Sequence, residues 1–196
     1  MKYFVLVALA LPVAFWSASA TQPVASAPVA AAKTLKVDGV HSSIVFRCMH
    51  LNTAWAYGRF DKFEGNIVLD GANSKVELEI DPASVNTANG GRDDHLRGPD
   101  FFDVKQFPKA SFKSTKVVPD GESKMKVDGD LTLHGVTKPI SFVVEKTGSV
   151  DDPKFGKKTG FHATLVVKRS EFGITYMKGG LGEDVEFMVS LEANEG

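Results

Sequence analysis

Five histidines, distributed among many carboxylates, are the residues of this sequence best suited to proton transfer. An imidazole changes its charge near neutral pH, and a neighbouring carboxylate can orient it for acid or base catalysis. Asp94 and His95 are adjacent and could form such a pair, but adjacent residues of a helix do not face one another. The five are His41, His50, His95, His134 and His162.

The sequence contains none of the short motifs that identify common catalytic and metal sites. There is no H-E-x-x-H zinc motif, no G-x-S-x-G nucleophile motif and no glycine-rich phosphate loop. The pair Gly90-Gly91 is typical of a turn before a helix, and Arg92, Asp93 and Asp94 favour an ion-pair and capping cluster. The sequence therefore predicts no catalytic residue, no metal site and no cofactor.

Charge and cysteine content argue against further classes of function. The 196 residues include 23 basic and 24 acidic side chains spread along the chain, so no basic stripe exists for phosphates. Nucleic acid is therefore not an expected partner. A single cysteine cannot form an internal disulfide or a cysteine-rich zinc site. We expect Cys48 to be a small buried hydrophobic residue that faces the interior.

The N-terminus has the features of a secretory signal peptide at residues 1–20. Lys2 precedes an apolar run, and Ala18-Ser19-Ala20 supplies the small residues that signal peptidase accepts. The run is shorter than the roughly 20 apolar residues of a membrane-spanning helix. The protein is therefore expected to be periplasmic or secreted, after cleavage following Ala20.

The remaining chain divides into a short linker and one domain. Residues 21–33 are rich in alanine and proline without an amphipathic period, which predicts a flexible tether. Residues 34–196 have the length of one ordinary globular domain with a core of its own.

Alternation of apolar and polar residues predicts an all-β fold. In residues 124–134 every second position is apolar or glycine, and the positions between are polar. This period of two is typical of a strand with one face in water, whereas a helix has a period near 3.6. We expect about eight strands by this criterion. They are predicted at 35–50, 56–70, 75–81, 109–118, 124–134, 138–146, 158–169 and 185–191.

Short turns connect most of these strands, and an eight-stranded antiparallel barrel is the expected architecture. The exception is the segment 88–103, in which a short capping helix is predicted before Gly98-Pro99 ends it. In 56–70 the inward parity changes near Asp61-Lys62, which predicts a bulge or bend there. The pattern alone leaves open whether the interior is solid or holds a ligand.

Five blocks of the sequence, in the same order, resemble the motifs of the YceI family. The first is similar to D-x-x-H-S-x-[VI]-x-F with a later His, and the second to G-x-F-x-x-F-x-G. The fourth and fifth agree with G-D-L-T-x-x-G-V-T-K and R-x-x-F-G-I. The blocks are residues 38–50, 58–65, 86–112, 129–138 and 169–174.

This resemblance implies a lipocalin-like barrel that binds and sequesters or transports a polyisoprenoid or other long-chain amphiphilic lipid without catalysis. It favours a hollow interior over a solid one. Transient membrane contact and a homodimer formed through a strand edge remain open. So does the identity of the lipid.

Strand parity selects the candidate ligand-binding residues. Gly129 lies in mid-strand, where the missing side chain is expected to leave room for a lipid chain. Phe101 belongs to the capping segment, and His50 either binds a head group or is satisfied by a protein neighbour. The candidates are Ile44, Phe46, His50, Phe60, Leu78, Phe101, Phe112, Val127, Gly129, Leu131, Phe142, Ala163, Leu165 and Phe187.

Two other classes of function remain as alternatives. One is a hydrolase or isomerase that acts on a small amphiphile with His and Asp residues at the barrel mouth. The other is a structural or adhesive module that uses its outer face or its tether. A stoichiometric lipid in the native protein distinguishes the carrier from both.

The signal-peptide prediction has a direct test. If cleavage follows Ala20, the exported protein begins at Thr21. N-terminal sequencing of the secreted or periplasmic fraction should return Thr-Gln-Pro-Val. Recovery of Met1 on a membrane-bound form would show that the segment is retained.

Overall fold

A computed structural model of the chain describes residues 32–195. The signal peptide expected at 1–20 and nearly all of the tether expected at 21–33 lie outside the described residues. Among residues 32–195, no helix has the length and apolar character needed to cross a membrane.

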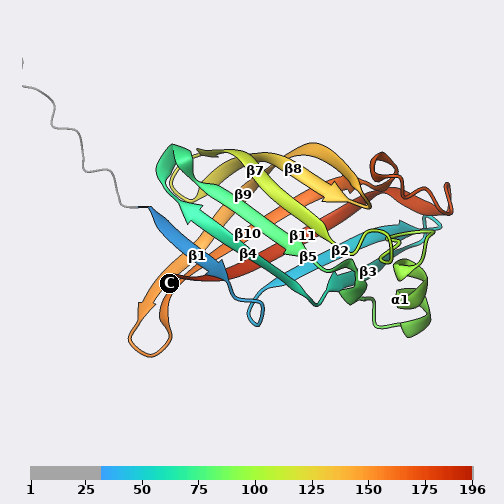
Figure 1. Cartoon of the computed structure of the whole chain (residues 1–196), viewed down its shortest axis with the longest axis horizontal. Helices are drawn as coiled ribbons and strands as arrows, with labels where there is room; N and C mark the ends of the chain where they lie inside the picture. The colour runs from blue at the N-terminus through green and yellow to red at the C-terminus, as the bar shows by residue number, and fades with distance from the viewer. Residues whose placement is uncertain (1–31, 196) are drawn as a thin grey trace, which may run out of the picture.

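Eight strands form a closed antiparallel barrel, which confirms the predicted fold class (Figure 1). Each strand pairs with its neighbours in the ring, and β11 closes the ring by pairing with β1. In ring order the strands are β1 (Lys33–Val37), β4 (Phe63–Leu69), β5 (Lys75–Ile80), β7 (Ala110–Pro119), β8 (Lys124–Leu133), β9 (Val136–Asp152), β10 (Gly156–Lys168) and β11 (Leu181–Glu195).

Three further strands extend the sheet beyond the ring. Strand β2 (Ser43–His50) continues along the edge of β11, β3 (Ala54–Phe60) pairs with β2, and the short β6 (Val85–Asn86) pairs with the end of β3. The expected strand 56–70 is therefore two strands, and the bend predicted at Asp61-Lys62 separates β3 from β4. This bend brings both inward parities to the interior, since Phe60 and Ile67 are both buried.

The expected strand 35–50 is also two strands, and here the prediction of one continuous strand is wrong. The chain turns after β1 because the Asp38 carboxylate accepts hydrogen bonds from the main-chain N–H of Val40 and of His41. Ser42 then anchors the chain to β11, because its hydroxyl donates to the Glu192 carbonyl and accepts from the Glu192 N–H. The inward parity also changes across this turn, from odd at Leu35 and Val37 to even at Ile44 and Phe46.

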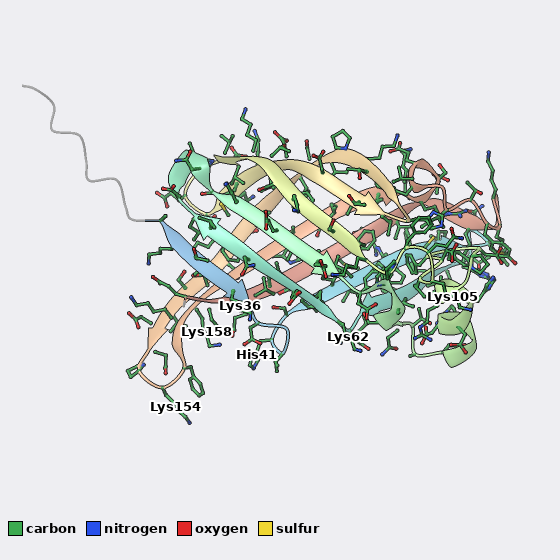
Figure 2. All side chains as sticks on the ribbon, in the orientation of Figure 1. Lys36, His41, Lys62, Lys105, Lys154 and Lys158 are labelled. Atoms are coloured by element: carbon green, nitrogen blue, oxygen red, sulfur yellow. The ribbon has the colours of Figure 1, made fainter. Side chains whose placement is uncertain are left out.

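A small charge network covers this turn (Figure 2). The Asp38 carboxylate lies 2.9 Å from Nδ1 of His41, and the Lys158 ammonium lies 2.5 Å from Glu192 and 3.7 Å from Asp38. The hydrogen bond from His41, followed by that from the Val40 N–H, holds the pKa of Asp38 well below its usual range. Lys158 is thus the positively charged partner of both carboxylates, Asp38 and Glu192.

The predicted capping helix is α1 (Gly90–Arg97), whose N-cap is Asn89. Thr87 precedes it and donates from its main-chain N–H to the buried Asp93 carboxylate. Arg92 donates to the hydroxyl and carbonyl oxygens of Thr87. These contacts give Arg92 and Asp93 a structural role at the start of the helix, and the ion pair of this run joins Asp94 to Arg97. Three 3-10 turns, η1 (Gly71–Asn73), η2 (Pro82–Ser84) and η3 (Arg169–Phe172), complete the fold.

Replacing Asp38 with Asn tests the contribution of the turn to stability. Because the pKa of Asp38 is lower in the folded chain than in the unfolded chain, its ionised form stabilises the fold above about pH 4. That contribution is lost as the pH falls toward the folded-state pKa. Urea unfolding at a series of pH values should therefore show Asp38→Asn less stable than wild type at neutral pH, with the difference shrinking in acid.

Asp120→Asn is the matched control, since the Asp120 carboxylate is exposed and lies 3.7 Å from Lys126. It should change the free energy of unfolding little at any pH. A deficit of Asp38→Asn that stays constant in acid would contradict the role given to the ionised carboxylate.

Candidate ligand-binding site

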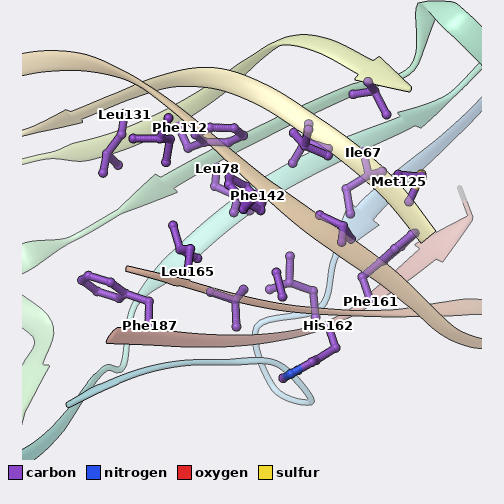
Figure 3. A pocket seen from close by; sticks show the side chains of 18 of the residues that line it. Ile67, Leu78, Phe112, Met125, Leu131, Phe142, Phe161, His162, Leu165 and Phe187 are labelled. Atoms are coloured by element: carbon purple, nitrogen blue, oxygen red, sulfur yellow. The ribbon is translucent and has the colours of Figure 1, made fainter. Parts of the chain in front are cut away.

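The barrel interior contains an apolar cavity of about 110 Å³ (Figure 3). Its wall comes from the inward faces of the ring strands, and Figure 3 shows Leu78, Phe112, Phe142 and Leu165 around it. His162 also borders this wall, but its side chain is exposed and points away from the apolar residues. We call this space the inner cavity.

A larger cavity of about 520 Å³ lies between the β2–β3 hairpin and the capping segment 88–103, which we call the cap. Its wall is mixed, because aromatic and aliphatic residues alternate with polar groups. The hairpin contributes Phe46, Cys48, His50, Trp55 and Tyr57, among others. The cap contributes Arg92, His95, Leu96, Phe101 and Phe102, and the segment before β11 contributes Ile174, Tyr176 and Met177. We call this space the outer cavity.

Two side chains belong to the walls of both cavities and mark where they meet. They are Val167 on β10 and Phe187 on β11. The ring of Phe187 packs 6.0 Å, between centroids, from Phe46, which lines only the outer cavity. An extended ligand that occupied both spaces would pass these two residues.

The charged groups beside the outer cavity are held by other protein groups. The Arg169 guanidinium is buried and donates to the carbonyl oxygens of Ile174, Tyr176 and Gly182 at 2.8 to 3.0 Å. It thereby ties the segment before β11 to the end of β10. Arg169 positions the wall, as Arg92 does in the cap.

His95 forms the one pair of a histidine with a carboxylate on the described wall of the outer cavity. Its Nε2 lies 2.9 Å from an oxygen of Asp100, and its ring packs edge-on against Phe101 and Tyr176, both at 5.0 Å between centroids. Asp94, its neighbour in sequence, binds Arg97 instead. The pair considered from the sequence, Asp94 with His95, is therefore not formed.

Cys48 lies on the wall of the outer cavity, half-buried, with its thiol 3.4 Å from the carbonyl oxygen of Gly182. Burial raises the pKa of this thiol above its usual value. A raised pKa lowers the thiolate fraction and with it the nucleophilicity. Cys48 faces a cavity as strand parity predicts, but the expectation that it is buried inside the barrel is wrong, because β2 lies outside the ring and the residue is only half-buried.

Comparison with known proteins agrees with this architecture. A family model described as the YceI-like domain matches residues 35–193. This chain belongs to the YceI family. Protein YceI of Salmonella newport (strain SL254) is 39% identical over 167 residues, which are 84% of this chain and 87% of that protein.

Solved structures share the YceI barrel. Burkholderia cenocepacia BcnA superposes with a TM-score of 0.73 at 25% identity, over 81% of this chain and 99% of that one. A polyisoprenoid-binding domain from Saccharophagus degradans, implicated in plant cell wall breakdown, gives a TM-score of 0.63 at 20% identity, over 83% of this chain and 98% of that one. The second likeness concerns the fold alone.

Twelve of the fourteen residues predicted from strand parity lie on the cavity walls of this YceI barrel. Whether they contact a ligand stays a prediction. The inner cavity is lined by Ile44, Leu78, Phe112, Val127, Leu131, Phe142, Ala163 and Leu165, the outer cavity by Phe46, His50 and Phe101, and both by Phe187.

Two predicted residues lie behind the walls. Phe60 packs between Phe46 and Phe102, with ring centroids 5.5 Å from each. The expectation that Gly129 leaves room for a lipid chain is wrong, because the Phe112 ring already covers it. A Cβ atom on Gly129 would collide with that ring and lie 2.5 Å from the carbonyl oxygen of Lys113.

Sequence reasoning missed several residues of the outer cavity in this YceI protein. Trp55 and Tyr57 have the outward parity of β3 and line the cavity because the hairpin lies outside the ring. Tyr176 and Met177 belong to a segment without any period. Parity could not have found these four residues.

Leucine is expected to act differently at two small residues, Ala163 on the wall of the inner cavity and Gly129 beneath the Phe112 ring. Ala163 lines the inner cavity, so Ala163→Leu adds its methyl groups to open space and should leave stability within about 1 kcal/mol of wild type. Gly129→Leu must displace Phe112 and strain the strand, which should cost about 1–3 kcal/mol or more. Thermal unfolding of the lipid-free proteins measures both. Equal destabilisation would mean that the space beside Ala163 is closed.

Proposed function

We propose that this protein binds a long-chain isoprenoid or a similar amphiphilic lipid and sequesters or transports it without catalysis. The observation that carries the proposal is the meeting of an apolar inner cavity with a larger, mixed outer cavity at Phe187. An amphiphile has the same two-part character. Its chain would lie in the ring and its head group among the polar residues of the outer cavity.

Burial of the chain supplies enough free energy for useful affinity. Each buried CH₂ group contributes about 0.8 kcal/mol, so a five-carbon isoprene unit contributes roughly 4 kcal/mol when fully buried. Three such units exceed the roughly 8 kcal/mol of a micromolar complex by about 4 kcal/mol, which is the low end of the cost of association. The apolar walls therefore suffice without a strong polar contact.

The outer cavity has polar groups suited to a head group. His50 lies on its wall in an exposed position, and no hydrogen bond to its imidazole is formed within residues 32–195. The hydroxyl of Tyr57 lies on the same hairpin. A few such groups at the mouth of an apolar pocket are typical of sites that fix the orientation of a ligand.

Several features favour binding over catalysis. The Cys48 thiol has a raised pKa, which is the opposite of an activated nucleophile. The pair of His95 with Asp100 is half-exposed to water, whereas a catalytic pair acts best where water is excluded. The S. degradans domain of the same fold is described as polyisoprenoid-binding. These points support a carrier over a hydrolase or isomerase at the barrel mouth.

The sequence supports a proposal about location as well. With a signal peptide at 1–20, the barrel would act in the periplasm or outside the cell, where a water-insoluble lipid needs a carrier between membranes. The tether at 21–33 would separate the barrel from the cleavage site. Contact with membranes would then be transient.

Extraction of the native protein tests the proposal. Organic solvent applied to protein purified without detergent should release a long-chain lipid in stoichiometric amount, identified by mass spectrometry. Ala163→Leu should retain less of it, because the new side chain occupies the inner cavity. Val166→Leu is the control on the same strand, since Val166 is exposed, and it should retain the wild-type amount.

If the native protein contained no lipid and had hydrolase activity, the enzyme hypothesis would replace the carrier hypothesis. Equal lipid content in Ala163→Leu and wild type would place the bound chain outside the inner cavity.

A further inference from the structure

Five large apolar side chains are exposed around the mouth of the outer cavity. The β2–β3 hairpin supplies Leu51, Trp55 and Tyr57, which are 52%, 43% and 51% exposed. The segment before β11 supplies Tyr176 and Met177, which are 42% and 40% exposed. All except Leu51 also line the outer cavity. We call these five residues the mouth rim.

Main-chain hydrogen bonds join the two segments of the mouth rim into one surface. The N–H of Leu51 donates to the carbonyl oxygen of Gly180 at 2.7 Å, and the N–H of Gly180 donates to Met177 at 2.9 Å. Strand pairing of His50 with Leu181 continues the same connection. The rim is therefore a continuous, fixed surface at one end of the molecule.

The backbone holds two of these side chains in an unfavourable conformation. Leu51 and Met177 have φ values of +50° and +53°, in the left-handed region that favours glycine or asparagine. Such positions are costly for ordinary side chains and often occur at binding surfaces. Here the cost is carried in order to present leucine and methionine side chains that remain exposed to water.

The chemistry of the mouth rim suits the boundary between lipid head groups and acyl chains. Tryptophan and tyrosine have an apolar body with a polar tip and are enriched at that depth in membranes. Arg47 stacks 4.4 Å above the Trp55 ring and is paired with Glu186, so its charge is compensated within the protein. The Lys178 side chain follows Met177 and adds a positive charge to the rim.

The position of the mouth rim connects it to the cargo. A long-chain lipid that crossed water between a bilayer and the outer cavity would expose its whole apolar surface, which is the cost that the barrel exists to avoid. Direct contact of the rim with the bilayer removes that step, because the cavity then opens straight onto lipid.

We propose that the mouth rim docks on the surface of a phospholipid bilayer and that the lipid passes between the bilayer and the outer cavity through it. The docking step rests on the proposed carrier function. Its occupant is the bilayer itself, and the rim inserts to the depth of the head groups and the first acyl carbons.

Trp55 makes the proposal directly measurable. The chain has two tryptophans, Trp16 and Trp55, and the closed barrel with its cap lies within residues 32–195. In protein that begins at Thr21, Trp55 is therefore the only tryptophan. Vesicles of phosphatidylcholine and phosphatidylglycerol should shift its emission to shorter wavelength, and brominated acyl chains should quench it in the protein that sediments with the vesicles.

Leu51→Asp separates docking from cargo binding, because Leu51 lies on the mouth rim and not on the cavity wall. Its affinity for the vesicles should fall about tenfold or more, the factor expected when one buried leucine side chain is lost. Lipid extracted from wild type and added without vesicles to the lipid-free variant should bind to it as to wild type, because this step bypasses docking.

Phe155→Asp is the matched control. Phe155 is 62% exposed at the tip of the β9–β10 hairpin, next to Lys154, at the end of the molecule away from the cap (Figure 2). This variant should bind vesicles as wild type does. Equal loss in both variants, or Trp55 emission unchanged by vesicles, would overturn the docking proposal. If the native protein carries lipid but fails these tests, the docking proposal is wrong and the carrier function still stands. If the native protein contains no lipid, the carrier function itself is wrong.

Discussion

A single edge of β11 pairs with two strands, and the rest of the architecture depends on that arrangement. Residues 193–195 pair with β1 and close the ring, while residues 181–190 pair with β2. The break between β1 and β2 would leave main-chain groups of β11 unpaired, and the Ser42 hydroxyl satisfies both the N–H and the carbonyl of Glu192. Beyond the break, the β2–β3 hairpin lies outside the ring. Its departure creates the outer cavity that the cap then covers.

The interior of the ring is incompletely filled, which links stability to occupancy. Protein cores pack as densely as organic crystals, and a dry cavity loses the contacts that its lining atoms would otherwise make. The ring provides aromatic side chains such as Phe112 and Phe142, with centroids 5.2 Å apart, and still leaves the inner cavity open. A ligand that binds the folded state would restore those contacts and stabilise the barrel by an amount that grows with the logarithm of its concentration over its Kd.

Periodicity predicted the inward face of each strand correctly where the backbone is regular. The alternation in β5, β8 and β11 fixed their inward faces, and the parity change at Asp61-Lys62 located the corner between β3 and β4. The break at 38–42 was missed, although the buried parity changes from odd at Leu35 and Val37 to even at Ile44 and Phe46. The dipeptide Asp38-Gly39 is a turn signal at the same place.

The error at Gly129 has a different cause. A glycine in mid-strand predicts a close approach by some group, and parity correctly placed it on the inner face. The sequence could not say that the group is the ring of Phe112, which lies opposite Leu131 in the paired strand. The mouth rim was missed for a third reason, since its side chains come from the β2–β3 hairpin and an irregular segment that the fold alone brings together.

Polar groups near the outer cavity are engaged mainly in holding its walls. Arg169 and Arg92 donate to protein oxygens, and His95 is held by Asp100 and two rings. A rigid wall favours the binding of a ligand, because a preformed cavity loses little conformational entropy on binding. Five of the large apolar side chains that remain exposed surround the mouth of this cavity, through which we propose that the lipid enters and leaves.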